Sequence, residues 1–186
     1  MPRLFFALQP TPGDSVALLE QSAALLQALG AQAYPAANIH ATLCFMGAVA
    51  PERVDALRSA AAGIVGRAFT LTFDRLEHWE PPRIVCATAQ HGHEAAMTLA
   101  LALAQAVTAA VVAAGFSPDS KPVRAHLTVA RKVDGTRAKE LAWPRPQGAP
   151  LVVHCDTFVL MESRREESGS IYSVVDSWPL YESGRA

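Results

Sequence analysis

Two histidines of the sequence are each followed, two positions later, by a threonine. The letters read HATL from His40 and HLTV from His126, so the pattern His-x-Thr-aliphatic occurs twice. On a β-strand, residues i and i+2 project from the same face, which would place each imidazole beside the hydroxyl of Thr42 or Thr128. The pattern therefore predicts two matching pairs, each with one proton-transferring ring and one hydroxyl donor.

These residue types suit chemistry at a phosphoryl group. Histidine titrates near neutral pH, so one ring can act as a base while the other, protonated, acts as an acid. A well-placed proton transfer contributes about 10²–10⁴ in rate. Threonine hydroxyls can donate hydrogen bonds to phosphoryl oxygens as negative charge builds up. If the two strands face each other across a groove, both pairs converge on one phosphoryl group, although spacing alone does not say which ring is the acid.

The remaining histidines favour other interpretations. A single histidine beside a threonine is more often a structural residue with satisfied hydrogen bonds, and only the repeat favours catalysis. His91 and His93 have a spacing that could hold a metal, but no cysteine or third ligand is near, so we expect none there. We expect His78 and His154 to be ordinary strand residues.

The hydrophobic pattern predicts an α+β protein. We expect strands near residues 3–8, 40–46, 69–79, 83–90, 126–133, 151–163 and 170–180, and helices near 14–30, 51–65 and 94–114. We expect Asp14 to cap the first helix. The hairpins in this order require antiparallel pairing, which excludes a doubly wound parallel sheet. Residues 132–150 are expected to form a surface excursion, and residues 164–169 a charged hairpin loop.

Composition limits the ways in which the protein can meet a polyanion. The 186 residues, 51% of them hydrophobic, suit one domain with a sizeable core. With 16 Lys and Arg against 17 Asp and Glu, the net charge is −1. The chain therefore lacks the positive field needed to coat nucleic acid or an anionic membrane. We expect a polyanion to be held by a few local donors, with a shallow salt dependence.

Three features bear on location. Cys44, Cys86 and Cys155 lie in separate apolar runs, which predicts reduced core residues and a cytoplasmic protein. Prolines and a glycine at residues 10–13 interrupt the apolar N-terminal run too early for a signal peptide. Residues 95–115 carry no charge and are long enough to cross a bilayer. They lack a flanking basic cluster and aromatic belt, so we expect a buried helix.

Beyond the two motifs, the sequence resembles the two-histidine phosphoesterases. Within them it resembles the bacterial and archaeal RNA 2′,3′-cyclic phosphodiesterases, also called 2′-5′ RNA ligases. The resemblance covers nearly the whole chain. Its segments are RLFFAL at 3–8, HATLCFMG at 40–47, PPR at 81–83, HLTVAR at 126–131, LMES at 160–163 and SIYSVVDSWPL at 170–180.

The resemblance implies a single two-lobed phosphoesterase domain over residues 1–186. Its two pseudo-symmetric lobes would have mostly antiparallel sheets lining a central groove, with helices on the outside and no metal or cofactor. It makes His40 the proton donor to the leaving oxygen and His126 the acceptor that activates water. It places Thr42, Thr128 and Arg131 on the substrate phosphate. The reaction would open a terminal RNA 2′,3′-cyclic phosphate to a 2′-phosphomonoester.

Two positions depart from a simple match. Ala125 stands where the family usually has proline before the second histidine. Arg131 follows His126 by five residues, so strict alternation would point it away from the groove. A bulge, or the end of the strand by Ala130, would be needed to bring it back. By the same alternation, the residues expected to anchor the opposite face in the core are Leu43, Phe45, Leu127 and Val129.

Other functions remain open at this stage. The same site could serve a 2′,5′-phosphodiesterase, an RNA ligase or an enzyme of small cyclic nucleotides. A non-catalytic module that binds RNA ends would need neither histidine. We expect RNA ends or small cyclic nucleotides as substrate, with no membrane, no obligate protein partner and a monomeric state. Side chains with a possible role in binding are Phe5, Trp79 and Trp143, which could stack on a base or belong to the core, and Lys121 and Arg124, which could attract a phosphate.

Overall fold

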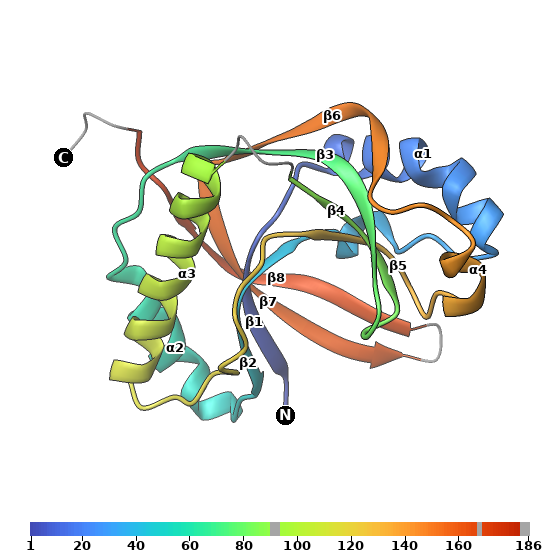
Figure 1. Cartoon of the computed structure of the whole chain (residues 1–186). Coiled ribbons are helices and arrows are strands. Elements are labelled where there is room, and N and C mark those ends of the chain that lie inside the picture. Colours follow the sequence, from blue (N-terminus) through green and yellow to red (C-terminus); the bar gives the residue numbers. More distant parts are fainter. Residues whose placement is uncertain (90–93, 167–168, 183–186) are drawn as a thin grey trace.

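Two four-stranded antiparallel sheets form the centre of the computed structural model, which describes residues 1–89, 94–166 and 169–182 (Figure 1). The first sheet has the order β2-β1-β7-β8, and its strands are β1 (Arg3–Leu8), β2 (Ala41–Ala48), β7 (Thr157–Glu166) and β8 (Gly169–Pro179). The second has the order β5-β4-β3-β6, with β3 (Phe69–Trp79), β4 (Ile84–Thr88), β5 (Leu127–Arg131) and β6 (Arg145–Cys155). The predicted α+β class is confirmed.

Helices cover the two sheets on the sides away from the centre (Figure 1). They are α1 (Pro12–Leu29), α2 (Val54–Ala62), α3 (Glu94–Ala113) and α4 (Gly135–Lys139), with short 3-10 helices at Ala36–Asn38 and Pro51–Arg53. Helix α1 packs against β6 and β5, whereas α2 and α3 pack on each other and α3 lies against β2 and β3. Each lobe thus has one sheet with an outer helical layer.

Helix α1 begins one turn earlier than the sequence suggested. Thr11 is its N-cap, and the Thr11 hydroxyl accepts a hydrogen bond from the backbone N–H of Asp14. The Asp14 carboxylate accepts in return from the Thr11 backbone N–H, so the two residues form a capping box. The helix ends at Gly30, whose φ of 60° is left-handed. Asp14 is therefore part of the cap, but from inside the first turn.

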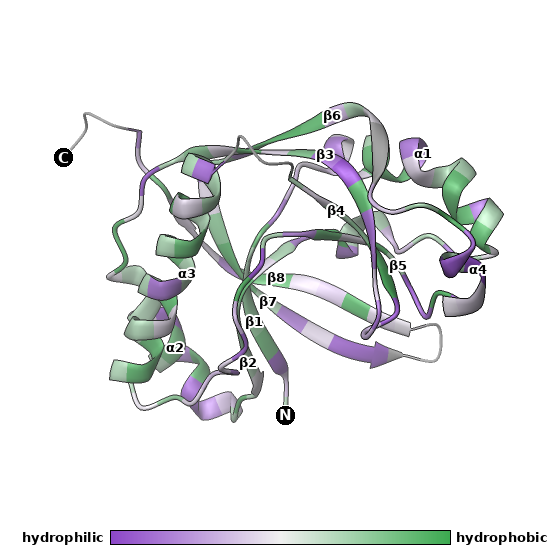
Figure 2. Ribbon diagram, in the orientation of Figure 1, coloured by the Kyte–Doolittle hydropathy of each residue, from purple (hydrophilic) through white to green (hydrophobic). Residues whose placement is uncertain are grey.

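A single hydrophobic cluster joins both sheets and the helices. Helix α3 is mostly hydrophobic along its length (Figure 2), and its residues buried in this cluster include Leu103, Val107 and Val111. Of the described helices, α3 alone is long and apolar enough to cross a membrane. It packs on β2, β3 and α2 along one face, but only 28% of its apolar 18-residue stretch is buried, so the expected buried helix lies in the core along one face only.

The segment 151–163 was predicted as one strand but forms parts of two. Strand β6 ends at Cys155 in the second sheet, and β7 begins at Thr157 in the first, so the chain changes sheet at Asp156. The Asp156 carbonyl accepts a hydrogen bond from the backbone N–H of Leu180 at 2.6 Å. Strand-forming residues lie on both sides of Asp156, so no break in the hydrophobic pattern marks this crossing.

Two predicted loops are partly regular structure. The surface excursion at 132–150 contains α4 and the first half of β6. Residues 164–166, expected in a charged loop, are the end of β7 and pair with the start of β8. Backbone pairing in the hairpin stabilises these strand ends although their residues are polar. Because they show no alternation of hydrophobic and polar residues, the sequence shows no sign of a strand here.

Candidate active site

Both motif histidines stand immediately before an edge strand, His40 before β2 and His126 before β5. The Nδ1 atom of each ring lies 2.7 Å from a backbone carbonyl oxygen two residues earlier, that of Asn38 or of Arg124. Because a carbonyl oxygen only accepts, Nδ1 carries the ring proton in both histidines. Each neutral ring therefore keeps its lone pair on Nε2, the atom available for proton transfer.

His40 is held by residues of both edges of its sheet. Its Nε2 lies 3.1 Å from Thr42 Oγ1, and its ring packs against the rings of Phe5 and Tyr172, with centroids 4.7 and 5.2 Å away. The buried Asn38 side chain donates to the Ser170 carbonyl at 2.6 Å and accepts from the Tyr172 backbone N–H at 3.1 Å. These bonds connect the residue that orients His40 to strand β8.

Burial is the main influence on the charge of His40, which is 9% exposed. The pKa of His40 is lowered from 6.5 to about 4, chiefly by desolvation and in smaller part by the nearby charges of Arg131 and His126, against the opposing effect of the Asn38 carbonyl. The ring is thus neutral at pH 7 before any anion binds.

Arg131 lies on the groove face of β5 because the strand contains a bulge. Thr128 pairs with Cys86 and Ala130 pairs with Val85, so Val129 is an extra residue between two consecutive positions of β4. One extra residue reverses the alternation, which places Arg131 on the same face as Thr128. Arg131 accordingly lines a cavity with His40 and Thr42. Of the two arrangements that the sequence allowed, the structure has the bulge, because β5 continues to Arg131 rather than ending by Ala130.

Strand β2 carries the same irregularity at the equivalent position. Thr42 pairs with Ala7 and Cys44 pairs with Phe6, so Leu43 is the extra residue. Phe45 consequently lies on the groove face, where the sequence had placed it in the main core. The other three expected anchors, Leu43, Leu127 and Val129, do belong to the core cluster. The two lobes thus present phenylalanine and arginine at corresponding sites.

The cavity beside His40 has a volume of about 420 Å³. Its lining residues are Arg3, Phe5, His40, Thr42, Phe45, Arg131, Ser163, Arg165, Ser170 and Tyr172. Beneath it lies a small apolar cluster that is separate from the main core and contains Phe5, Ala7, Val159 and Met161. Cationic and hydroxyl groups on an apolar floor are suited to an anion attached to a ring.

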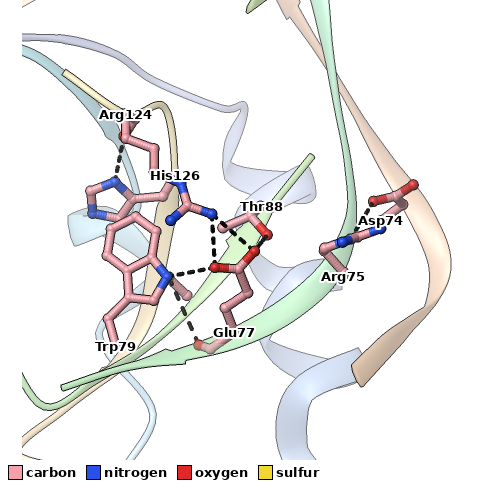
Figure 3. A network of polar contacts seen from close by, with 8 residues as sticks. Asp74, Arg75, Glu77, Trp79, Thr88, Arg124 and His126 are labelled. Carbon is pink, nitrogen blue, oxygen red and sulfur yellow. Dashed lines mark hydrogen bonds and ion pairs between the residues drawn. The ribbon is translucent and has the colours of Figure 1, made fainter. Parts of the chain in front are cut away.

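A polar network supports His126 from the side of β3 (Figure 3). The Trp79 ring packs on the His126 ring with centroids 4.6 Å apart, and the Arg124 guanidinium lies 4.5 Å from the Trp79 ring centroid. Glu77 accepts hydrogen bonds from Trp79 Nε1 at 2.6 Å, from Arg124 Nη2 at 2.9 Å and from Thr88 Oγ1 at 2.9 Å. Glu77 thereby fixes the tryptophan and the arginine that flank His126.

The same network sets the charges around His126. Burial would raise the pKa of Glu77, but hydrogen bonds from Trp79, Thr88 and Arg124 outweigh it and lower this pKa overall. The pKa of His126 is lowered, first by burial and then by the positive charges of neighbouring arginines, while Glu77 acts in the opposite direction. Glu77 therefore stays ionised and supports the charged form of His126.

The sequence did not single out Glu77. Its only local signal is that residues 77 and 79 share one face of β3. Trp79 and Arg124 had been considered for binding, and the structure places Trp79 against His126. Lys121, considered for the same role, forms an ion pair with Asp119 at 3.2 Å.

A second cavity, of about 840 Å³, shares Thr42 and Phe45 with the first. Helix α3, strand β2 and residues 119–124 form its walls, and Thr42 and His126 lie at its edge. Side chains such as Leu101, Ala104 and Val112 give it a mainly apolar surface. His40 thus lines the cationic cavity, His126 lines the apolar one, and Thr42 lines both.

The other candidate residues lie elsewhere. His78 packs beside Trp143, with ring centroids 5.8 Å apart, and His154 Nδ1 contacts the Thr70 hydroxyl at 3.3 Å. Trp143 Nε1 donates to the Ala138 carbonyl at 2.8 Å. His91 and His93 fall outside the described residues. Within the described part of the chain, no group of three or more potential ligands could hold a metal ion.

The two His-x-Thr motifs belong to different sheets, and Thr42 of the first and His126 of the second line one cavity. A family model described as the 2′-5′ RNA ligase superfamily matches residues 12–167. Because this match spans most of the chain, the protein belongs to the 2′-5′ RNA ligase superfamily. A search of curated protein sequences gave no significant match.

Solved structures show the same fold. Escherichia coli LigT in complex with 3′-AMP superposes with a TM-score of 0.82 at 24% identity, over 97% of this chain and 99% of that one. LigT in complex with phosphate gives 0.77 at 26% identity, also over 97% and 99%. The protein TT0787 of Thermus thermophilus gives 0.73 at 23% identity over the same shares. The likeness extends along the whole described chain.

Proposed function

We propose that the protein hydrolyses RNA 2′,3′-cyclic phosphate ends to 2′-phosphomonoesters by acid–base catalysis with His40 and His126, without a metal. The observation that carries this proposal is that His40, Thr42 and Arg131 line one cavity although they come from two lobes. His126 lines a second cavity together with Thr42. The nucleotide and phosphate complexes of Escherichia coli LigT support a nucleotide substrate.

In the proposed step, Nε2 of His126 takes a proton from water and the resulting hydroxide attacks phosphorus. The bond between phosphorus and the ribose O3′ breaks as Nε2 of His40 transfers a proton to that oxygen. Arg131, Thr42 and Thr128 donate hydrogen bonds to the non-bridging oxygens, whose charge grows in the transition state. The products are a 2′-phosphomonoester and a free 3′-hydroxyl, and proton exchange with water restores both rings.

The donor role of His40 depends on the substrate. With a pKa of about 4, the free ring is neutral at pH 7, and the Thr42 hydroxyl can donate to its Nε2. A bound phosphate anion places negative charge beside the ring and offsets the positive charge of Arg131, so it raises the pKa of His40. The substrate and the catalytic proton are therefore taken up together, and Thr42 turns its donor toward the phosphate.

Turnover of adenosine 2′,3′-cyclic phosphate in excess EDTA tests this function. We expect hydrolysis at an undiminished rate, with 2′-AMP rather than 3′-AMP as the product separated by chromatography. Loss of activity with EDTA would contradict the metal-free mechanism. Binding of the nucleotide without turnover would favour a non-catalytic module for RNA ends.

The family name favours one alternative substrate, a 2′-5′ linkage. A 2′-5′-linked diadenosine assayed beside the cyclic nucleotide distinguishes the two. We expect the cyclic phosphate to be the better substrate, because opening its five-membered ring releases ring strain that the open 2′-5′ diester does not have. A cytoplasmic location and a monomeric state stay predictions from the sequence.

A further inference from the structure

The groove face of the first sheet continues past His40 as a row of arginines and serines. Arg3 on β1 pairs with Ser163 on β7, and Arg165 on β7 pairs with Ser170 on β8. Directly paired residues of antiparallel strands share a face, and so do alternate residues of one strand. These four side chains therefore share one face, and all of them line the cavity beside His40.

The row lies next to the place where the reacting phosphate is expected. Phe5, whose ring contacts His40, is two residues from Arg3 on β1, which corresponds to about 7 Å along the strand. Phe5 itself pairs with Met161, two residues before Ser163 on β7. Moving outward from His40, the surface thus changes from an apolar floor to a cationic strip.

The positive charge here exceeds what one phosphodiester needs. Arg131 already faces His40 and Thr42, and Arg3 and Arg165 bring two more guanidinium groups into the same cavity. None of the described residues that line this cavity is acidic. No carboxylate in the described part of the chain forms an ion pair with Arg3 or Arg165. The protein as a whole carries a net charge of −1, so this concentration of cations is local.

The neighbouring Arg164 shows the contrast. It projects from the opposite face of β7, where its guanidinium donates two hydrogen bonds of 3.0 Å to the Glu162 carboxylate. A surface ion pair of this kind satisfies the arginine within the protein. Arg3 and Arg165 instead direct donors that suit phosphate oxygens into a cavity, and Ser163 and Ser170 add hydroxyl donors beside them.

We propose that Arg3 and Arg165, with Ser163 and Ser170, form a second phosphate subsite, for the phosphate on the 5′-oxygen of the terminal nucleoside. In an RNA chain this is the last internucleotide phosphate, so the subsite distinguishes an RNA end from a cyclic mononucleotide. The inference rests on the proposed function, because it takes the reacting phosphate to lie between His40 and His126.

The test compares substrates that lack this second phosphate with substrates that carry it. They are adenosine 2′,3′-cyclic phosphate, its 5′-phosphorylated form, and the dinucleotide ApA with a terminal 2′,3′-cyclic phosphate, at one fixed ionic strength. We expect kcat/KM to be higher for the two substrates with a second phosphate. In Arg165→Ala and in Arg3→Ala, the ratio of their kcat/KM to that of the plain cyclic nucleotide should fall about tenfold. Arg164→Ala removes the same charge from the opposite face and should leave this ratio unchanged.

Three results would overturn the inference. An unchanged ratio in Arg165→Ala and Arg3→Ala would mean that these arginines do not recognise a second phosphate. An equal fall of the ratio in Arg164→Ala would mean that only overall charge matters. A preference for the 5′-phosphorylated mononucleotide without one for the dinucleotide would overturn the assignment to an RNA chain.

Binding measurements keep the test independent of hydrolysis. Titration calorimetry with 3′-AMP and with adenosine 3′,5′-bisphosphate compares ligands that also differ by one 5′-phosphate. We expect the bisphosphate to bind about tenfold more tightly to the unmodified protein and to lose this advantage in Arg165→Ala. Equal affinities in the unmodified protein would overturn the subsite. A tighter bisphosphate with no turnover of any cyclic substrate would refute only the proposed function.

Discussion

Thr128 and Arg131 lie on the same face of β5, although three positions separate them and a regular strand would place them on opposite faces. The extra residue Val129 between the pairs formed with Cys86 and Val85 causes this. The bulge converts a strand that opens with a histidine motif into one that also delivers a guanidinium to the cavity. Strand β2 has the same bulge but delivers Phe45, so only one lobe supplies the arginine.

Replacement of Arg131 tests whether this guanidinium binds the phosphate. In Arg131→Ala we expect kcat/KM for adenosine 2′,3′-cyclic phosphate to fall about 100-fold, as for the loss of one preorganised donor to a transition-state oxygen. Arg131→Lys should restore only part of it, since an ammonium cannot form two parallel hydrogen bonds to a phosphate. Steady-state kinetics measure both variants. Full activity in Arg131→Lys would show that charge alone suffices.

The leaving group tests the division of labour between the two histidines. Thymidine 5′-p-nitrophenyl phosphate releases p-nitrophenolate, which needs no proton from an acid. If His40 is the donor, the fold-decrease in activity caused by His40→Ala should be at least ten times smaller on this ester than on the cyclic nucleotide. His126→Ala should lose activity on both, because each reaction needs a base. If His126→Ala instead lost much less activity on this ester than on the cyclic nucleotide, His126 would be the proton donor and His40 the base.

The local parts of the site could be predicted from the sequence, whereas the parts that depend on pairing could not. The two motifs and the strands that follow them are encoded within a few neighbouring residues, whereas the position of these strands at the sheet edges is not. The bulges at Val129 and Leu43 depend on how β5 pairs with β4 and how β2 pairs with β1. Nothing in the sequence next to these residues indicates that pairing. For that reason Phe45 was wrongly placed in the main core.

The support for His126 is non-local in the same way. Glu77 and Arg124 form their ion pair at 2.9 Å across 47 positions of sequence, and neither residue type is unusual for an exposed strand or loop. Likewise, the change of sheet at Asp156 left no break in the pattern of apolar residues. Arg165 seemed to belong to a solvated loop until the pairing of β7 with β8 showed its place in the cavity.

Glu77→Gln tests the network around His126. The change removes the negative charge that supports the protonated form of His126, so it should lower the pKa of His126 further. The basic form of the ring would then persist to lower pH, and the limb of the pH–rate profile that reports this base should move to lower pH. NMR titration of the His126 ring measures the shift directly. Glu162→Gln, which removes a carboxylate paired with Arg164 in the other sheet, is the control and should leave this titration unchanged.

The buried His40 should make the free protein less stable in mild acid. Its pKa is about 4 in the folded chain against an ordinary value of 6.5, so the unfolded chain binds the proton more readily. This contribution to the free energy of unfolding is fully present above pH 6.5 and is lost as pH falls toward 4. Linkage gives a loss of about 2 kcal/mol between pH 7 and pH 5.

Urea unfolding at these two pH values measures the loss. His40→Gln removes the titrating group and should make the unfolding free energy less dependent on pH by about that amount. Saturating phosphate should have a similar effect on the unmodified protein, because the anion raises the pKa of His40 in the folded state. An equal pH dependence in His40→Gln would show that other groups cause the acid sensitivity.

The central claim is that two histidines, one from each lobe, act together on one phosphate. Its most direct test is the rate of opening of adenosine 2′,3′-cyclic phosphate by His40→Ala and by His126→Ala, with His154→Ala as a matched control on the exposed side of β6. We expect each motif variant to lose at least about 10² in kcat while keeping a native circular dichroism spectrum, and the control to keep full activity. Full activity in either His40→Ala or His126→Ala would contradict the account.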